Sequence, residues 1–270
     1  MLDADLKKIS SKLRVLALDA IYNGGSGHPG GSLSIADIMA VLYFETMNID
    51  PQDPKNADRD RFVLSKGHAA PILYAALAAR GFIPEADLKI LRHTDSYLQG
   101  HPDMKHTAGV DMSTGSLGQG ISAACGMAKA ALMQKRDYRV YTILGDGESD
   151  EGQVWEALMF AHHHKLHNLT IIIDHNGLQI DGSNDEVMKL DNLKARFEAF
   201  GLNTIEIDGN NLTEIRQALA SAKAYKEGAT VIIANTVKGK GVDFMENQVG
   251  WHGKAPNADE FAKALAQLED

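Results

Sequence analysis

Apolar residues along the chain follow two spacings, one typical of helices and one of buried strands. Near the N-terminus, Leu6, Ile9 and Leu13 begin a repeat of three and four residues that predicts an amphipathic helix. Other segments are short, mostly apolar and without polar alternation, as in strands that are covered on both faces. The predicted strands are 61–64, 139–144, 169–174, 203–207 and 230–235.

Helical patterns separate these strands along the chain. The predicted helices lie at 69–80, 121–131, 154–164, 193–200, 212–225 and 259–268. Alternating strands and helices indicate an α/β fold whose central parallel sheet has helices on both faces. No internal repeat, low-complexity segment or linker divides the chain, so we expect residues 1–270 to form a single domain.

Two segments rich in glycine interrupt the periodic pattern. Residues 24–32 predict a loop, after which Ser34 and Asp37 resemble a capping box that opens a helix through Phe44. Residues 93–120 have little periodicity but many Gly, His, Ser and Thr residues. A loop of this length inside a compact domain is usually functional.

Composition excludes several classes of protein. Among 270 residues, 27 are Lys or Arg and 36 are Asp or Glu, a formal charge of −9, so no nucleic-acid partner is expected. The one cysteine, Cys125, allows no internal disulfide and favours a reducing compartment, which we take to be the cytoplasm. The apolar runs are far shorter than the ~20 residues that span a bilayer, and no signal peptide is evident, so we expect no membrane association.

Candidate metal ligands follow two of the predicted strands. Asp146 lies in a GDG sequence directly after one strand, and Asn176 ends a DHN sequence at the end of the next. Because open parallel sheets bind ligands at the carboxyl ends of their strands, a carboxylate and a carboxamide can meet there. Such hard oxygen ligands suit magnesium, and the glycines let backbone amides approach a diphosphate. Taken alone, the GDG sequence is also an ordinary strand-to-helix turn, and Asn176 with Gly177 another turn.

The paired placement of these motifs resembles the thiamine diphosphate motif, and further segments narrow the resemblance to transketolase. The segments, in the order of that family, are NGGSGHPGGS at 23–32, FVLSKGHA at 62–69, GHPD at 100–103, TGSLGQG at 114–120, GDGESDEG at 145–152, DHNGLQIDG at 174–182 and WHG at 251–253. They cover only the N-terminal, diphosphate-binding part of transketolase. The resemblance therefore implies the thiamine diphosphate-binding fold and one subunit of a split transketolase.

A split transketolase implies a separate C-terminal subunit that carries the pyrimidine-binding and third domains. Each cofactor is then expected between unlike chains, with two such units paired as an α2β2 heterotetramer. The implied cofactors are thiamine diphosphate and Mg²⁺, with Ca²⁺ or Mn²⁺ as substitutes. The implied substrates are sugar phosphates of carbohydrate metabolism, as in the pentose phosphate pathway.

The resemblance also assigns roles to individual residues. The implied metal ligands are Asp146, the side chain of Asn176 and the backbone carbonyl of Leu178. The implied cofactor contacts are His68, Gly115, Ser116, Leu117, Gly147, Asn176 and His252. The implied catalytic histidines, which contact the sugar, are His28, His101 and His252. Imidazoles titrate near neutrality and can donate to a carbonyl oxygen or move its proton, while the thiamine ring stores the carbanion.

Several candidates also have simpler explanations. The three consecutive histidines at 162–164 are expected to be surface residues, because successive helical positions point in different directions. Cys125 is expected to be a buried packing residue. Glu151 matches an acidic residue near the subunit interface of the family, but the helix dipole also explains a carboxylate at a helix start. Without the family match, His28 and His68 are equally well explained as loop residues that cap a following helix.

The leading hypothesis is an enzyme that transfers a two-carbon ketol unit from a ketose phosphate to an aldose phosphate, together with its partner subunit. The alternatives are a specialised catabolic ketolase, a deoxyxylulose phosphate synthase-like enzyme, and a non-catalytic, cofactor-binding regulatory subunit. The sequences SKGHA, GHPD and TGSLGQG match transketolase better than the synthase. In the family, the residues that grip the acceptor phosphate belong largely to the half that this chain does not resemble, so the sugars stay open.

Overall fold

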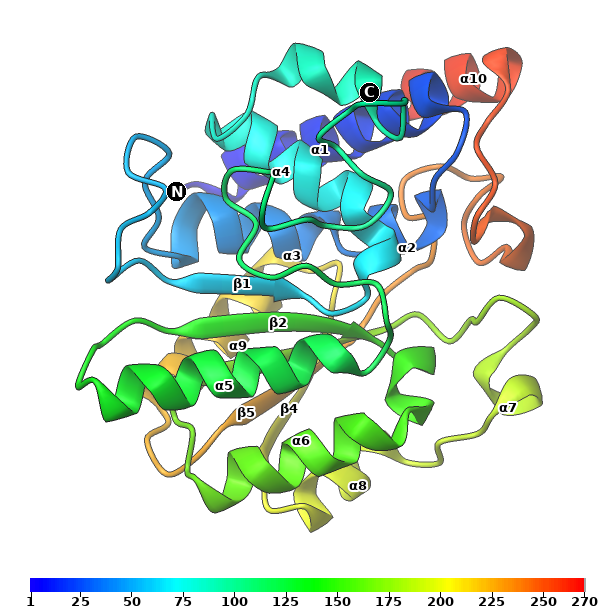
Figure 1. Cartoon of the computed structure of the whole chain (residues 1–270). Helices are drawn as coiled ribbons and strands as arrows, with labels where there is room; N and C mark the ends of the chain where they lie inside the picture. The colour runs from blue at the N-terminus through cyan, green and yellow to red at the C-terminus, as the bar shows by residue number, and fades with distance from the viewer. Residues whose placement is uncertain (270) are drawn as a thin grey trace.

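The computed structural model describes residues 1–269 and contains a five-stranded sheet between two layers of helices (Figure 1). The strands are β1 (Arg61–Leu64), β2 (Val140–Gly145), β3 (Leu169–His175), β4 (Asn203–Asp208) and β5 (Thr230–Asn235). They pair in the order β1-β2-β3-β5-β4, and every pair is parallel. The predicted α/β fold with a central parallel sheet is confirmed. Asp270, the last residue of the domain predicted at 1–270, lies outside the described residues.

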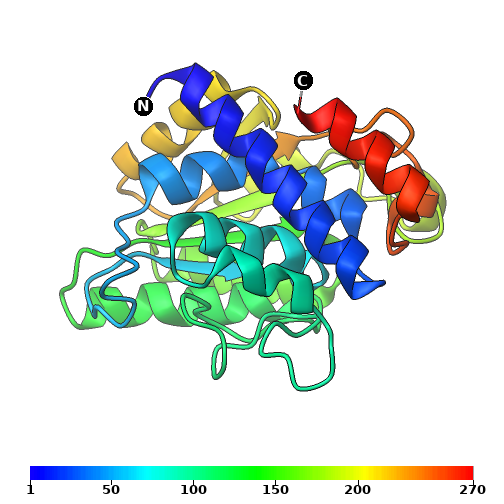
Figure 2. The same ribbon diagram turned by 90° about the horizontal axis from the view of Figure 1, so that it is seen from above.

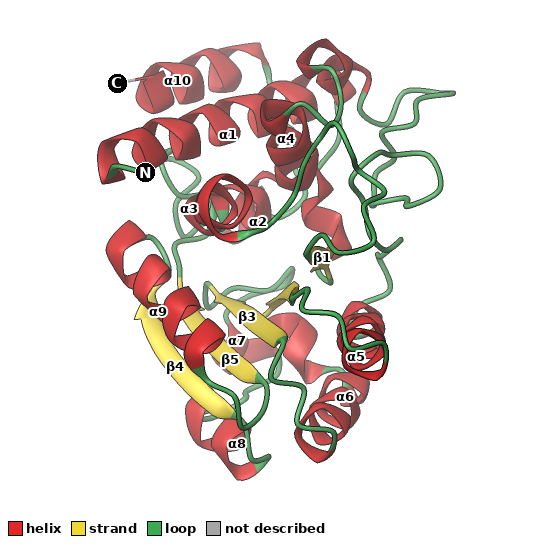
Figure 3. Ribbon diagram, turned by 90° about the vertical axis from the view of Figure 1, so that its left-hand side faces the viewer, coloured by secondary structure: helices red, strands yellow, loops and turns green. Residues whose placement is uncertain are grey.

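Helices cover both faces of the sheet (Figures 1 and 3). The apolar cluster on one face includes α1 (Asp3–Gly24), α3 (Ala36–Val41), α4 (Ala70–Arg80) and α9 (Leu212–Ala224), and that on the other includes α5 (Gln119–Met133), α6 (Gly152–His163) and α8 (Leu193–Ala199). Successive strand residues point to opposite faces, so in β3 Ile172 joins the first cluster, whereas Ile171 and Ile173 join the second. The strands β1, β2, β3 and β5 are mostly apolar because both of their faces are buried, whereas the edge strand β4 is partly exposed and includes the exposed Glu206.

The C-terminal helix α10 (Ala258–Glu269) lies beside α1 in an outer layer; Figure 2 shows the two helices in red and blue. The rings of Tyr22 and Phe261 stack between them, with their centroids 4.2 Å apart. A third apolar cluster joins Leu18 and Leu268 to Trp251. This packing holds the segment between β5 and α10, which supplies two residues of the candidate site.

The segment after α1 departs from the prediction. Part of the loop expected at 24–32 is helical, because α2 (Pro29–Leu33) starts with a proline, which is favourable in the first helical turn. The predicted capping box at Ser34 and Asp37 is wrong, and α3 begins without a side-chain cap. Ser34 Oγ instead donates to Asp174 (2.8 Å), and Asp37 pairs with a buried arginine of α1. Partners far along the chain have replaced the local capping bonds.

The remaining helical elements are short. They are a π-helical turn (Leu42–Thr46) that extends α3, the 3-10 turns Gly67–Ala69, Glu85–Ile90, Gly147–Asp150 and Val249–Trp251, and helix α7 (Asn184–Val187). Residues 93–118 form the predicted long loop, and α5 begins at Gln119. Within residues 1–269, no helix has both the length and the apolar character needed to span a membrane.

Candidate active site

The carboxyl ends of the two central strands open into one cavity. β2 and β3 pair so that Gly145 lies opposite Asp174, and Asp146 and Asn176 follow these residues. The side chains of Asp146 and Asn176 both line a cavity of about 300 Å³. Seven further residues given roles above also line it: His28, His68, Gly115, Leu117, Gly147, Leu178 and His252. Segments spread over most of the chain therefore meet at this edge of the sheet.

Asp146 is held by donors on three sides. Its carboxylate accepts hydrogen bonds from the backbone amides of Gly147 (2.8 Å) and Gly177 (2.6 Å) and from the side chain of Asn184 (2.9 Å). Burial raises the pKa of Asp146, and the nearby Asp174 carboxylate raises it further. A cation beside Asp146 counteracts both effects, because it favours the charged carboxylate. Hydrogen bonds thus orient the Asp146 carboxylate, while its raised pKa shows that a bound cation would stabilise its charged form.

The donors around Asp146 suit a hard cation bound together with a diphosphate. Asn176 Nδ2 donates to Asp174 (2.9 Å), which fixes the orientation of the carboxamide. Across the described chain, no three His, Cys, Asp or Glu side chains are arranged to hold a metal. Mg²⁺ is usually bound through one or two carboxylates together with phosphate oxygens and water. One aspartate with neutral oxygen donors therefore fits Mg²⁺ and does not fit a histidine- or thiolate-bound metal.

A buried lysine that the sequence analysis missed contacts the third implied ligand. Lys238 Nζ donates to the backbone carbonyl of Leu178 (2.9 Å) and lies 2.9 Å from Nδ1 of His252. Lys238 is 2% exposed, and burial lowers its pKa to about 8. Its ammonium supplies positive charge on the side of the cavity where a diphosphate is expected. The sequence did contain a signal for this residue. Lys238 lies in the TVKGKG sequence directly after β5, and a lysine between a strand end and a glycine is well placed to reach a ligand.

A second buried lysine joins the loop after β1 to β3. Lys66 Nζ lies 2.6 Å from Asp174 Oδ2 and donates to the Gly31 carbonyl (2.6 Å). The two charged side chains are 1% and 0% exposed. Burial acts to raise the pKa of Asp174, but the Lys66 charge and hydrogen bonds from Lys66, Thr236 and Ser34 hold it below its ordinary value. This ion pair fixes the loop that carries the SKGHA sequence.

Three histidines from distant segments face one another in the cavity. The ring centroids of His28 and His68 are 5.1 Å apart, those of His28 and His252 5.5 Å, and those of His68 and His252 5.3 Å. Burial, assisted by nearby cations, lowers the pKa of His28 to about 4, that of His252 to about 3, and that of His68 well below its ordinary value. At neutral pH each imidazole is therefore neutral, with one nitrogen that donates and one that accepts.

His101 and Ser116 are not among the residues that line the cavity. His101 packs against Gly115 at the rim of the cavity. A Cβ added to Gly115 would come within 2.9 Å of the His101 ring, so position 115 requires glycine. Ser116 is exposed on the same loop. Burial lowers the pKa of His28 and His101, and the charge of Arg92 lowers both further. Arg92, which no local pattern distinguishes, thus adds a cation beside the implied sugar-binding histidines.

Glu148, which lines the cavity, connects three loops. It is 3% exposed, and its carboxylate accepts hydrogen bonds from Ser65 Oγ (2.5 Å) and the backbone amides of Gly118 (2.8 Å) and Gly145 (3.1 Å). The loop that carries the TGSLGQG sequence is thereby tied to the ends of β1 and β2. Sequence reasoning singled out Glu151 instead, which is exposed and packs against Gly118.

The other candidates lie away from this cavity. Cys125 is 2% exposed in α5, and burial raises the pKa of its thiol to about 12, so it is the packing residue that was predicted. On α6, His162 and His163 are exposed as expected, while His164 is half-buried against Phe160.

Comparisons with known proteins agree with this geometry. The family "Transketolase, thiamine diphosphate binding domain" matches residues 6–269. The chain is 46% identical to a 6-deoxy-6-sulfo-D-fructose transketolase subunit from Clostridium sp. (strain MSTE9), over 98% of this chain and 96% of that subunit. It is 40% identical to an apulose-4-phosphate transketolase subunit from Phocaeicola vulgatus, over 97% and 92% of the two chains.

Longer relatives are matched over part of their length. Human transketolase is 48% identical over 97% of this chain but only 41% of its own. The crystal structure of transketolase from Campylobacter jejuni superimposes with a TM-score of 0.94 at 36% identity, covering 100% of this chain and 43% of that one. The expectations of a thiamine diphosphate-binding fold and of a transketolase-type enzyme are confirmed. The chain therefore belongs to the transketolase family and corresponds to its thiamine diphosphate-binding domain.

Proposed function

We propose that this chain is the N-terminal subunit of a split transketolase and is active only with a separate C-terminal subunit. Together they transfer a two-carbon ketol unit from a ketose phosphate to an aldose phosphate. The observation that carries the proposal is the single cavity in which oxygen donors for a metal meet three neutral histidines. The near-complete match to two named subunits, against 41% of human transketolase, supports a separate partner. With that partner we propose an α2β2 assembly, as the family resemblance implies.

The cavity has suitable donors for Mg²⁺, with Ca²⁺ or Mn²⁺ as substitutes, and for thiamine diphosphate. Asp146, Asn176 and the carbonyl of Leu178 are the proposed metal ligands. Lys238, which donates to that carbonyl, is placed to pair with diphosphate oxygens once the carbonyl binds the metal. The proposed cofactor contacts are His68, Gly115, Ser116, Leu117, Gly147, Asn176 and His252. When bound, the thiamine ring supplies the electron sink for the ketol carbanion.

His28, His101 and His252 are the proposed sugar-handling residues. Burial keeps His28 and His252 uncharged at neutral pH, so His28 can accept a hydroxyl proton without first losing its own. His252 Nδ1 already accepts from the Lys238 ammonium, so its Nε2 carries the proton and can donate a hydrogen bond to the substrate carbonyl. General acid–base catalysis of this kind contributes about 10²–10⁴ in rate. The His28 ring nitrogen Nδ1 is buried without a partner in the described chain, which leaves it available to a ligand.

The substrate sugars have two candidate classes. The first, implied by the family resemblance, is the sugar phosphates of the pentose phosphate pathway. The two subunit relatives are named for 6-deoxy-6-sulfo-D-fructose and apulose-4-phosphate, so a specialised catabolic ketolase is the second candidate. The lone buried cysteine suits a reducing compartment, and we propose that the reaction takes place in the cytoplasm.

The decisive experiment mixes the purified chain with its partner subunit, thiamine diphosphate and Mg²⁺, and measures ketol transfer from a panel of ketose phosphates and sulfosugars. We expect activity only with both chains present. Asp146→Asn should abolish transfer and metal-dependent cofactor binding, whereas Asp53→Asn, which neutralises an exposed carboxylate, should leave both unchanged. Inactivity with a partner that is verified to bind would contradict the proposal.

A cofactor titration separates the enzyme from a regulatory subunit. Tight thiamine diphosphate binding together with partner-dependent transfer supports the enzyme. Tight binding with no transfer from any donor in the panel favours a non-catalytic role. A product released from pyruvate and an aldose phosphate would instead favour a synthase-like reaction.

A further inference from the structure

A second cavity lies at the opposite edge of the sheet. It opens beside the amino ends of β2 and β3, so the length of these strands, ~20 Å, separates it from the candidate active site. Its volume is about 640 Å³, within the range of about 300–1,000 Å³ that is typical of ligand pockets. None of the residues given a catalytic, cofactor or metal role above lines it.

The charge of this cavity is opposite to that of the chain. Its lining includes five Lys or Arg residues and three Asp residues. In the whole chain, by contrast, 27 Lys or Arg residues are outnumbered by 36 Asp or Glu residues. Arg136 forms an ion pair with Asp58 at 2.8 Å. Within residues 1–269, the other four cations of the lining form no ion pair; among them are Arg139, Lys223 and Lys226. The cavity therefore has unbalanced positive charge.

Among these cations, Arg139 indicates most directly that the cavity favours an anion, because its side chain is buried, at 7% exposure. Its Nη2 donates to the backbone carbonyls of His167 (3.2 Å) and Ala222 (3.3 Å), and its buried Nε has no hydrogen-bond partner. Carbonyl acceptors satisfy hydrogen bonds but do not neutralise the charge. Buried charges are normally paired with an opposite charge, so this guanidinium favours an anion nearby.

Helix dipoles do not explain the arrangement. Lys223 lies in the last turn of α9, where a cation is favoured by the partial negative charge of the helix end. Arg139 precedes β2 and belongs to no helix. Lys226 donates to the Lys223 carbonyl at the same helix end (2.9 Å), so the helix end accounts for both lysines, but not for the buried arginine of this cavity.

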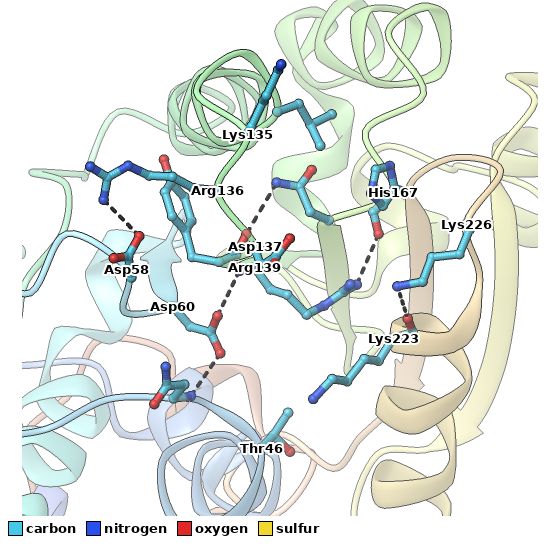
Figure 4. Close-up of a pocket in the computed structure, with 14 residues that line it drawn as sticks. Thr46, Asp58, Asp60, Lys135, Arg136, Asp137, Arg139, His167, Lys223 and Lys226 are labelled. Carbon is cyan, nitrogen blue, oxygen red and sulfur yellow. Dashed lines mark hydrogen bonds and ion pairs between the residues drawn. The ribbon is translucent and has the colours of Figure 1, made fainter.

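We propose that this cavity binds a small phosphate ester, with its phosphoryl group held by Arg139, Lys223 and Lys226. Figure 4 shows the Lys223 ammonium directed toward the open space between Asp60 and Thr46, while the Arg139 guanidinium points toward His167, on the side of the cavity where Lys226 lies. The Asp60 carboxylate accepts two backbone amides, at 2.7 and 2.9 Å, and keeps lone pairs for ligand hydroxyls. A carboxylate facing the cations disfavours a bare anion but suits a ligand that joins a phosphoryl group to hydroxyls.

Isothermal titration of the full chain with glycerol phosphate, and separately with inorganic phosphate, tests this proposal. We expect saturable binding of glycerol phosphate that is tighter than that of inorganic phosphate and weakens with added salt. Lys223→Gln and Lys226→Gln should each weaken binding about tenfold, because each removes a charged phosphate contact from an exposed position that does not threaten folding. Lys194→Gln, the same change at an exposed lysine of α8, is the matched control.

The active site must be distinguished from this cavity in the same experiment. His28→Gln should bind glycerol phosphate as the wild type does. The proposal is overturned if the wild type shows no saturable binding, if Lys223→Gln binds unchanged, or if His28→Gln rather than Lys223→Gln loses binding. Equal affinity for inorganic phosphate overturns the assignment of an ester.

Discussion

Replacing Lys66 by methionine should destabilise the chain strongly, because it leaves the Asp174 carboxylate buried without its cation. The pair lies at 2.6 Å, with side chains 1% and 0% exposed. Removing one partner of a buried ion pair typically costs about 3–5 kcal/mol. Ser34, Thr236 and Asn176 still donate to Asp174, so we expect a loss near the lower end, about 3 kcal/mol.

Urea unfolding measures this loss, and two further variants isolate its cause. Lys254→Met breaks an exposed ion pair with Glu260 at a similar distance, 2.7 Å, and should cost no more than about 1 kcal/mol. In the double variant Lys66→Met/Asp174→Asn the uncompensated charge is removed as well. We expect this variant to be more stable than Lys66→Met alone, although the hydrogen bond to the Gly31 carbonyl is not restored.

The pH dependence of the free energy of unfolding provides a third test of the role of Lys66. Without Lys66, burial should raise the pKa of Asp174 above its unfolded value, so the native state retains a proton that the unfolded state loses. Stability then falls as the pH rises, and the deficit of Lys66→Met should shrink toward pH 4. A loss below about 1 kcal/mol, or a double variant no more stable than the single one, would refute the reasoning.

Other predictions address the site and the core. Gly67→Ala should weaken thiamine diphosphate binding about tenfold in a calorimetric titration with Mg²⁺, because a Cβ there would lie 2.7 Å from the backbone nitrogen of Gly115. The control Gly126→Ala should bind normally, because no atom lies within 4 Å of a Cβ at that position. His28→Gln should flatten the pH dependence of stability between about pH 6.5 and 4, since the lowered pKa of His28 means that the unfolded state binds the extra proton and wild-type stability falls as the pH falls through that window. An equal fall of the urea midpoint in the wild type and in His28→Gln would contradict this. Ile172→Ala should lower the free energy of unfolding by about 2–5 kcal/mol and Ile172→Val by about 0.5–1.5 kcal/mol, because this side chain is 1% exposed. Equal losses would contradict the expectation that the loss grows with the volume removed from the core.

Four of the five strands were predictable from the sequence because burial on both faces leaves a simple apolar signature, whereas the edge strand β4 is partly exposed. Each predicted strand is present within one residue of its expected bounds, as in 169–174 against Leu169–His175. The failures fall where long-range polar contacts decide the structure. Ser34 and Asp37 have the spacing of a capping box, but their side chains bond to Asp174 and Arg14, which no local pattern can indicate.

The residues of the candidate site also separate into those that sequence motifs predicted and those that only long-range contacts reveal. Recurring motifs located most of the cavity lining, because glycine-rich turns and histidines stand out in short segments. Lys66, Glu148 and Lys238 lie in recognisable short motifs, but the sequence analysis assigned them no role in the site. Their significance depends on burial, and Lys66 meets Asp174 across 108 positions of the chain.

The strand order has a consequence for how this site can change. Asp146 and Asn176 follow β2 and β3, each of which is hydrogen-bonded to a neighbour on both sides. The three facing histidines sit on connecting segments outside the sheet. Under the proposed function, substitutions near His28, which is not among the proposed cofactor contacts, can change which sugars are accepted while Asp146 and Asn176 keep their positions at the centre of the sheet.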